Sequence, residues 1–180
     1  MRKSIIRVAL LAILSLGFAI PAVALADDEG KGCSNLGTWF GVMGLGDTRL
    51  AGFSGTVTGK SSNMGTNHFS FPTFDPSFGL DVPPFNLAVS ITDMRGDWVR
   101  TGGNTFDYTF MGFAMDAENV PVYIAKVSGD VALIQDCQYQ YITAVMEVFL
   151  PSMSPFHMEP IAVISLGEFY GYRAAVDLPY

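Results

Sequence analysis

The feature that most constrains how this chain folds is a period of two within residues 95–134. Phe106, Tyr108 and Phe110 alternate there with polar residues, as in a strand that buries one face. Turn-forming residues at 102–104 precede this segment, and a second turn composition follows it. The stretch therefore predicts consecutive antiparallel strands joined by short connections, a β-meander.

Residues 1–26 have the composition of a secretion signal. Basic residues precede an apolar run within residues 5–20, and a small-x-small cleavage site ends at Ala26, the order found in signal peptides. The alternative is an uncleaved membrane anchor, for which the apolar run is short, since a bilayer span needs about 20 residues. We expect an exported protein, periplasmic or extracellular, whose mature residues 27–180 form one domain without a transmembrane helix.

The charge of the chain is strongly acidic. The formal net charge is −7, and removing the three basic residues of the leader makes it −10. Nucleic-acid binding depends on basic patches that neutralise phosphates. We therefore expect no nucleic-acid partner.

The two cysteines, Cys33 and Cys137, are expected to form one disulfide, because paired cysteines in an exported chain are usually oxidised. Closing a loop of about 100 residues would stabilise the fold by up to about 4.7 kcal/mol. The cysteines and the two histidines lack the paired spacings of a zinc site. The sequence indicates neither a metal site nor a cofactor.

Several other segments have strand-like patterns, and two loops interrupt them. The loops, residues 71–84 and 151–160, are rich in proline, which cannot donate to a central ladder. The further strands are expected at residues 36–45, 51–58, 85–92, 139–150, 161–166 and 169–176. About eight to ten strands in so small a domain leave exposed edges unless the sheet closes. We predict an all-β fold, a single antiparallel up-and-down barrel, with a sandwich as the alternative.

A motif in the middle of the chain resembles a group of bacterial secreted barrel proteins. It reads Gly-x-Trp-x-Arg-Thr-Gly over residues 96–102, followed by Thr105-Phe106, Thr109-Phe110 and an acidic turn at Asp116. The resemblance covers about forty residues. It implies a calycin-like or allene-oxide-cyclase-like barrel, and it brings no established activity with it.

A shorter motif near the mature N-terminus resembles the Gly-x-Trp signature of lipocalins, small secreted barrels that carry hydrophobic molecules. It reads Gly37-Thr38-Trp39-Phe40. In that family an arginine near the C-terminus packs over the tryptophan, and the resemblance assigns this place to Arg173. The chain departs from the family because it lacks the middle Thr-Asp-Tyr signature and a C-terminal helix pattern.

The aromatic residues are the preferred candidates for a ligand site, since ligand pockets are mostly apolar. The predicted ligand-binding residues are Trp39, Trp98, Phe106, Tyr108, Phe110 and Tyr123. The leading hypothesis is a barrel that carries or sequesters a small hydrophobic molecule. The same residues would alternatively fill a solid core.

Two other functions stay open. The two proline-rich loops would form a contact patch for a protein partner or for oligomerisation. A cyclase or isomerase would instead use Glu147, His68 or His157 beside an apolar substrate. No serine lies in a Gly-x-Ser-x-Gly elbow, and no catalytic residue is assigned. The sequence favours a binding protein over an enzyme.

Overall fold

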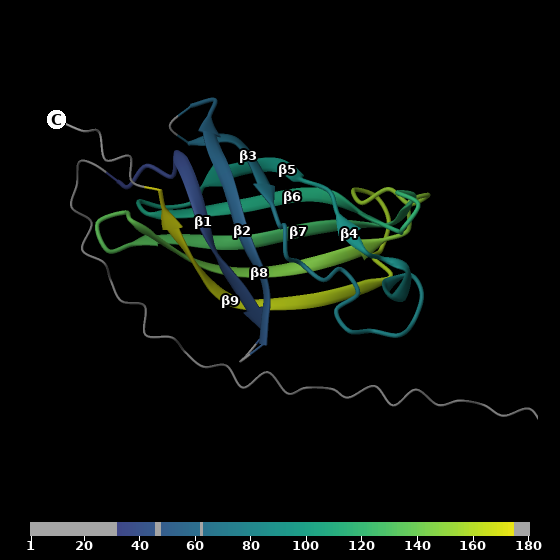
Figure 1. Ribbon diagram of the computed structural model, residues 1–180. Helices are drawn as coiled ribbons and strands as arrows, with labels where there is room; N and C mark the ends of the chain where they lie inside the picture. The colour runs from purple at the N-terminus through teal and green to yellow at the C-terminus, as the bar shows by residue number, and fades with distance from the viewer. Residues whose placement is uncertain (1–31, 46–47, 62, 175–180) are drawn as a thin grey trace, which may run out of the picture.

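The structure, a computed structural model, describes residues 32–45, 48–61 and 63–174. These residues form nine β-strands and one short 3₁₀ turn, η1, without an α-helix among them (Figure 1). The elements are β1 (Gly37–Leu45), β2 (Thr48–Gly59), β3 (Met64–Ser70), η1 (Phe85–Leu87), β4 (Ser90–Ile91), β5 (Met94–Arg100), β6 (Thr105–Met115), β7 (Pro121–Ile134), β8 (Tyr139–Phe149) and β9 (Ala162–Arg173).

Eight of these strands close into a barrel. Each barrel strand pairs antiparallel with the next one along the chain, and β1 also pairs with β9. The short β4 lies outside this cycle and pairs with the end of β6. The prediction of a single antiparallel up-and-down barrel of eight to ten strands is confirmed. Closure leaves no long edge strand unpaired among the described residues.

The meander predicted for residues 95–134 is confirmed as β5, β6 and β7. On β6, Phe106 is fully buried and Tyr108 is 4% exposed, while Asp107 between them faces solvent. Their aromatic rings point into the barrel because one face of every strand lines the interior. The alternation in the sequence thus reports the inside and the outside of the barrel.

The strand predicted at residues 85–92 is wrong. Residues 85–87 form η1, and only Ser90 and Ile91 pair as a strand, β4. The buried side chains here are Phe85 and Ala88, which lie three residues apart, as the spacing of a 3₁₀ turn requires. The period-two alternation of residues 85–92 therefore gave a wrong prediction, because the buried residues are three positions apart.

The break predicted at Gly167, between two closing strands, is also wrong. β9 is continuous and carries a bulge, because Ala144 pairs with Gly167 and Val145 pairs with Ser165, leaving Leu166 as an extra residue. Gly167 has a φ of +72°, which glycine adopts without steric cost. The bulge moves the inward side from even to odd residue numbers, which reads as a break in the sequence.

The two ends of the barrel differ in how they are covered. The connections of residues 71–93 and 150–161 lie at one end, where Phe69 pairs with Met94 and Val148 pairs with Ala162. At the other end a short segment, residues 33–36, precedes β1. We refer to residues 71–89 as the capping loop and to residues 33–36 as the N-terminal plug.

Candidate functional site

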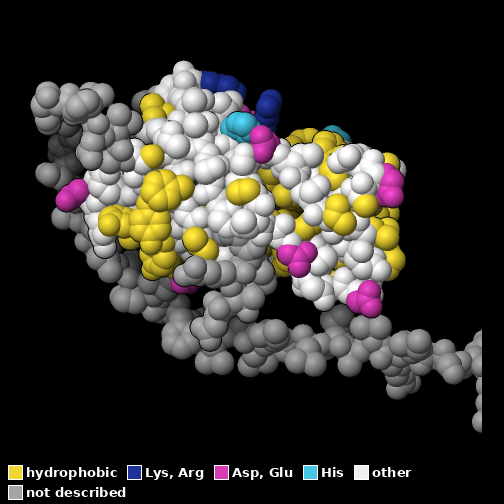
Figure 2. All heavy atoms as spheres, in the orientation of Figure 1, with side chains coloured by type: hydrophobic (Ala, Val, Ile, Leu, Met, Phe, Trp, Pro, Cys, Tyr) yellow, Lys and Arg dark blue, Asp and Glu magenta, His cyan; other side chains and the backbone are white. Residues whose placement is uncertain are grey.

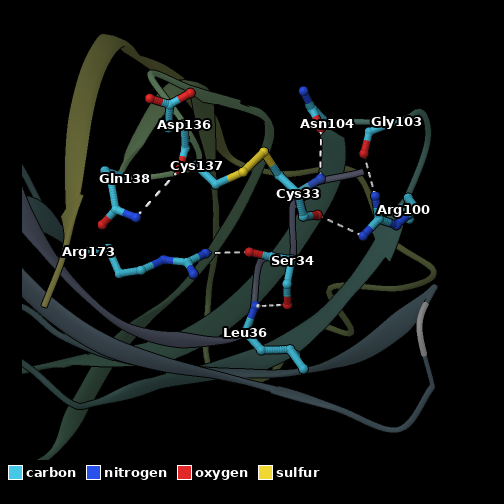
Figure 3. The surroundings of a disulfide bond; sticks show 10 residues. All are labelled: Cys33, Ser34, Leu36, Arg100, Gly103, Asn104, Asp136, Cys137, Gln138 and Arg173. Carbon is cyan, nitrogen blue, oxygen red and sulfur yellow. Dashed lines mark hydrogen bonds between the residues drawn. A yellow bond between two sulfur atoms is a disulfide. The ribbon is translucent and has the colours of Figure 1, made fainter. Parts of the chain in front are cut away.

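The N-terminal plug is fixed to one end of the barrel (Figure 3). Cys33 and Cys137 form the predicted disulfide, with their Cα atoms 5.6 Å apart. The Cys33 backbone N–H donates to Asn104 Oδ1 at 2.9 Å, and Arg100 Nη2 donates to the Cys33 carbonyl at 2.8 Å. Arg173 donates to the carbonyl of Ser34. A covalent bond and two arginines therefore hold this segment in place.

A buried polar cluster joins the N-terminal plug to the barrel interior through Asn35. Asn35 and Gln140 are each 1% exposed and Tyr108 is 4% exposed. Gln140 Nε2 donates to Asn35 Oδ1 at 2.9 Å and to the Tyr108 hydroxyl at 3.4 Å, and Asn35 Nδ2 donates to the same hydroxyl. Burial raises the pKa of Tyr108 well above its ordinary value, so the phenol stays neutral.

Trp39 contacts both the polar cluster and Arg173 at the end of the barrel that holds the N-terminal plug. Its ring is fully buried, and its Nε1 donates to the Asn35 carbonyl at 2.9 Å. The Arg173 guanidinium lies 4.7 Å from the ring centroid of Trp39, as the resemblance to lipocalins implied. The contact places a cation over the tryptophan at the end of the barrel that holds the N-terminal plug.

An apolar cavity of about 40 Å³ extends from the polar cluster toward the capping loop. Its lining is aliphatic, methionine-rich and aromatic, with the polar side chains of Tyr108 and Gln140 on the side of the cluster. The phenylalanine rings that line it are Phe53, Phe69, Phe71, Phe74, Phe110 and Phe169. Since one water needs about 10–15 Å³ by this measure, the cavity in its present shape holds only a few atoms.

The capping loop packs over the cavity through a row of aromatic rings. Ring centroids of Phe71, Phe74, Phe78, Phe85 and Tyr123 follow one another at 5.1 to 6.3 Å. The Tyr123 hydroxyl, which comes from β7, donates to the buried carbonyl of Pro76 at 2.6 Å. The Gly52 N–H of β2 also donates to the Thr73 hydroxyl at 2.9 Å. Hydrogen bonds and ring contacts therefore attach the loop to the barrel wall.

We predict that Tyr123→Phe loosens the capping loop. The substitution leaves the buried Pro76 carbonyl without its donor, which costs about 1–3 kcal/mol. Hydrogen exchange of the amides of residues 74–80, followed by mass spectrometry, should accelerate. Tyr172→Phe on the outer face is the control and should leave this exchange unchanged. Equal protection of the loop in both variants would contradict the attachment.

The structure divides the predicted ligand-binding residues into two groups. Tyr108 and Phe110 line the cavity. Trp39, Trp98 and Phe106 belong to the packed core and do not line it. Tyr123 is fully buried beneath the capping loop, where it contacts Phe85 rather than the cavity.

The titratable residues considered for catalysis lie away from the cavity. Glu147 is on the outer side of β8, where a carboxylate oxygen is 2.7 Å from Lys126 Nζ. His68 Nε2 lies 3.1 Å from a carboxylate oxygen of Asp93 on the outer surface, and His157 is exposed in the β8–β9 connection. Among the residues that the structure describes, none of the three lines the cavity, and no cluster of three or more metal-binding side chains occurs.

Gln140, one of the two polar side chains of the cavity wall, and an outer aromatic stripe were not identified from the sequence. Gln140 is polar, whereas the other inward residues of β8 are apolar. The alternation along this strand was the sequence signal for its inward position. The stripe crosses the outer faces of β1, β8 and β9, where Figure 2 shows hydrophobic side chains together. Its rings are Phe40, Tyr139, Tyr141, Tyr170 and Tyr172. The i, i+2 tyrosine pairs were its sequence signal.

Fold and cavity together define a small antiparallel β-barrel with an apolar interior site. No family model and no solved structure matches the chain. It is similar to UDP-N-acetylmuramate–L-alanine ligases of Psychrobacter cryohalolentis and Psychrobacter arcticus, each 27% identical over 134 residues. The matched region covers 71% of this chain and 28% of each ligase, so the chain spans less than a third of the length of these relatives. In the described part of the chain, no helix has the length and hydropathy of a membrane span.

Proposed function

We propose that the protein is an exported barrel that binds a small hydrophobic molecule and carries or sequesters it. The observation that carries the proposal is the apolar cavity between the polar cluster and the capping loop. Cavities lined by apolar side chains with a few polar groups are the usual form of small-molecule sites. Tyr108 and Phe110, two of the residues expected to bind ligand, contribute to its wall.

Ligand entry requires movement of the capping loop. The cavity of about 40 Å³ is smaller than an organic molecule of several carbons, and Phe71 and Phe74 supply part of its wall from the loop side. Withdrawal of these two rings would enlarge the site without changing a barrel strand. Binding is therefore coupled to opening at the capped end, as with other loops that close over ligands.

Export is the second part of the proposal. The disulfide is of the kind that persists in oxidising compartments, and residues 1–26, which lie outside the described residues, have the pattern of a secretion signal. The resemblances to calycin-like, allene-oxide-cyclase-like and lipocalin barrels point the same way. The contact of Arg173 with Trp39 is the feature of this chain that supports the lipocalin resemblance.

The ligase activity of the similar proteins is not carried over to this chain. Their name specifies a nucleotide-linked sugar acid as substrate, which carries phosphate and carboxylate charges. The described cavity has no basic side chain in its lining, and burying such charges without a counter-charge is costly. A neutral apolar ligand fits the cavity better.

The proposal is tested by titrating the purified protein with N-phenyl-1-naphthylamine, a neutral apolar dye that fluoresces in apolar sites. We expect saturable fluorescence enhancement. Val127→Phe, which fills the cavity from β7, should abolish it, whereas Val145→Phe on the outer face of β8 is the matched control and should bind as the wild type does. No enhancement with the wild type, or equal enhancement with both variants, would refute an interior site.

A protein-interaction role is the second candidate, and exposed apolar residues favour it. The connections at the capped end expose Leu80, Val82, Phe156 and Met158, with Phe156 at 67%. Exposed apolar residues gathered at one end of a domain can form a contact site. Sedimentation of the protein before and after Phe156→Ser/Met158→Ser would test it, since self-association through this surface should be lost. The same sedimentation coefficient over a wide concentration range would count against self-association.

A further inference from the structure

The polar cluster at the inner end of the cavity has more hydrogen-bond donors than its own members use. The amides of Asn35 and Gln140 each carry two N–H groups, and the Tyr108 phenol carries one O–H. Three hydrogen bonds connect the three side chains. Donor hydrogens therefore remain without a partner within the cluster, and this holds whichever way the two amides are turned.

The three bonds leave the Tyr108 O–H and one N–H of Asn35 without a partner in the cluster, and Tyr108 is one of the residues that line the cavity. Tyr108 and Gln140 are the polar side chains in the described cavity wall, and no charged side chain lines it. A buried donor without an acceptor is costly, so an acceptor atom on a ligand gains both affinity and a defined orientation here. A carboxylate would lose its hydration and meet no cation in the wall.

We infer that the ligand is a neutral, mostly apolar molecule with one hydrogen-bond acceptor oxygen at its inner end, such as a ketone, an aldehyde or an ester. The inference rests on the proposed function and specifies its ligand class. The apolar body occupies the cavity that Phe69, Phe110 and Phe169 help to line, and the oxygen accepts a hydrogen bond from the Tyr108 hydroxyl. Phe71 and Phe74 then close behind the ligand.

The test compares acetophenone with isopropylbenzene, a hydrocarbon of the same shape, as competitors of N-phenyl-1-naphthylamine. Tyr108→Phe should weaken acetophenone binding by about threefold to tenfold, the value of one neutral hydrogen bond, and should leave isopropylbenzene binding within twofold of the wild type. Tyr139→Phe on the outer face of β8 is the control and should change neither. Benzoate should compete more weakly than acetophenone.

A second measurement does not depend on the variant. The carbonyl stretch of ¹³C-labelled acetophenone bound to the wild-type protein should lie below its frequency in hexane, because the oxygen accepts a hydrogen bond. An unshifted carbonyl stretch would overturn the inference while leaving apolar binding intact, as would equal effects of Tyr108→Phe on both competitors. If neither the dye nor the competitors bind the wild type, the proposed function itself fails and the inference fails with it.

Discussion

Replacing both cysteines, Cys33→Ala/Cys137→Ala, is expected to lower the free energy of unfolding by up to about 4.7 kcal/mol. The disulfide links residues 104 positions apart, and closing a loop of that length removes much of the conformational freedom of the unfolded chain. The bond also fixes the N-terminal plug, whose Asn35 bonds to the buried Tyr108 and Gln140. Urea denaturation followed by circular dichroism measures the loss.

Reductant provides the control for this prediction. Dithiothreitol should shift the urea midpoint of the wild type toward that of the double variant, and it should have no effect on the variant itself. The disulfide should be fully reduced once the protein is unfolded in urea. A wild-type midpoint that dithiothreitol leaves unchanged under these conditions would contradict a stabilising disulfide. The slope of the transition should stay similar if the native surface is preserved.

Trp39→Ala is expected to lower the free energy of unfolding by about 3–5 kcal/mol, the cost of deleting a large buried aromatic ring. The Trp39 ring is fully buried, and its removal also takes away the donor to the Asn35 carbonyl and the surface on which Arg173 lies. Because the Trp39 ring packs at the end of the barrel that holds the N-terminal plug, hydrogen exchange of the plug should accelerate. Urea denaturation and exchange mass spectrometry measure the two effects.

Arg173→Met distinguishes the contribution of the Arg173 charge from that of the Trp39 ring. The variant keeps an apolar chain over Trp39 and loses the guanidinium contact, which is 4.7 Å from the ring centroid. A cation–π contact of this exposure contributes about 0.5–1 kcal/mol. The variant also loses the hydrogen bond from Arg173 to the Ser34 carbonyl, which contributes about 0.5–1.5 kcal/mol, so it should be less destabilised than Trp39→Ala. Exposed substitutions usually change the free energy of unfolding by less than about 1 kcal/mol. A loss this small for Trp39→Ala would show that the ring does not stabilise the core.

The architecture was predictable because period-two alternation survives in most strands. Phe106, Tyr108 and Phe110 on β6 show it directly, and closure follows from the number of strands in a small domain. The pattern failed where the backbone departs from regular pairing. At Phe85 and Ala88 a 3₁₀ turn replaced the strand, and at Gly167 a bulge changed the phase of β9.

The candidate site was predictable only as an aromatic interior. Which rings surround free space depends on how the capping loop packs, so Tyr108 and Phe110 were grouped with Trp39, Trp98 and Phe106, which fill the core. The polar cluster depends on contacts across long distances in sequence, with Asn35 and Gln140 105 positions apart. No local pattern reports such a contact.

The pairing of β1 with β9 affects how the protein reaches its native state. The first strand finds one of its two neighbours only after the last strand has been synthesised, and contacts so distant in sequence form slowly. Until then, β1 presents an open hydrogen-bonding edge that can recruit other chains. Yield on refolding should therefore fall as protein concentration rises, and addition of a holdase chaperone should raise the recovered fraction.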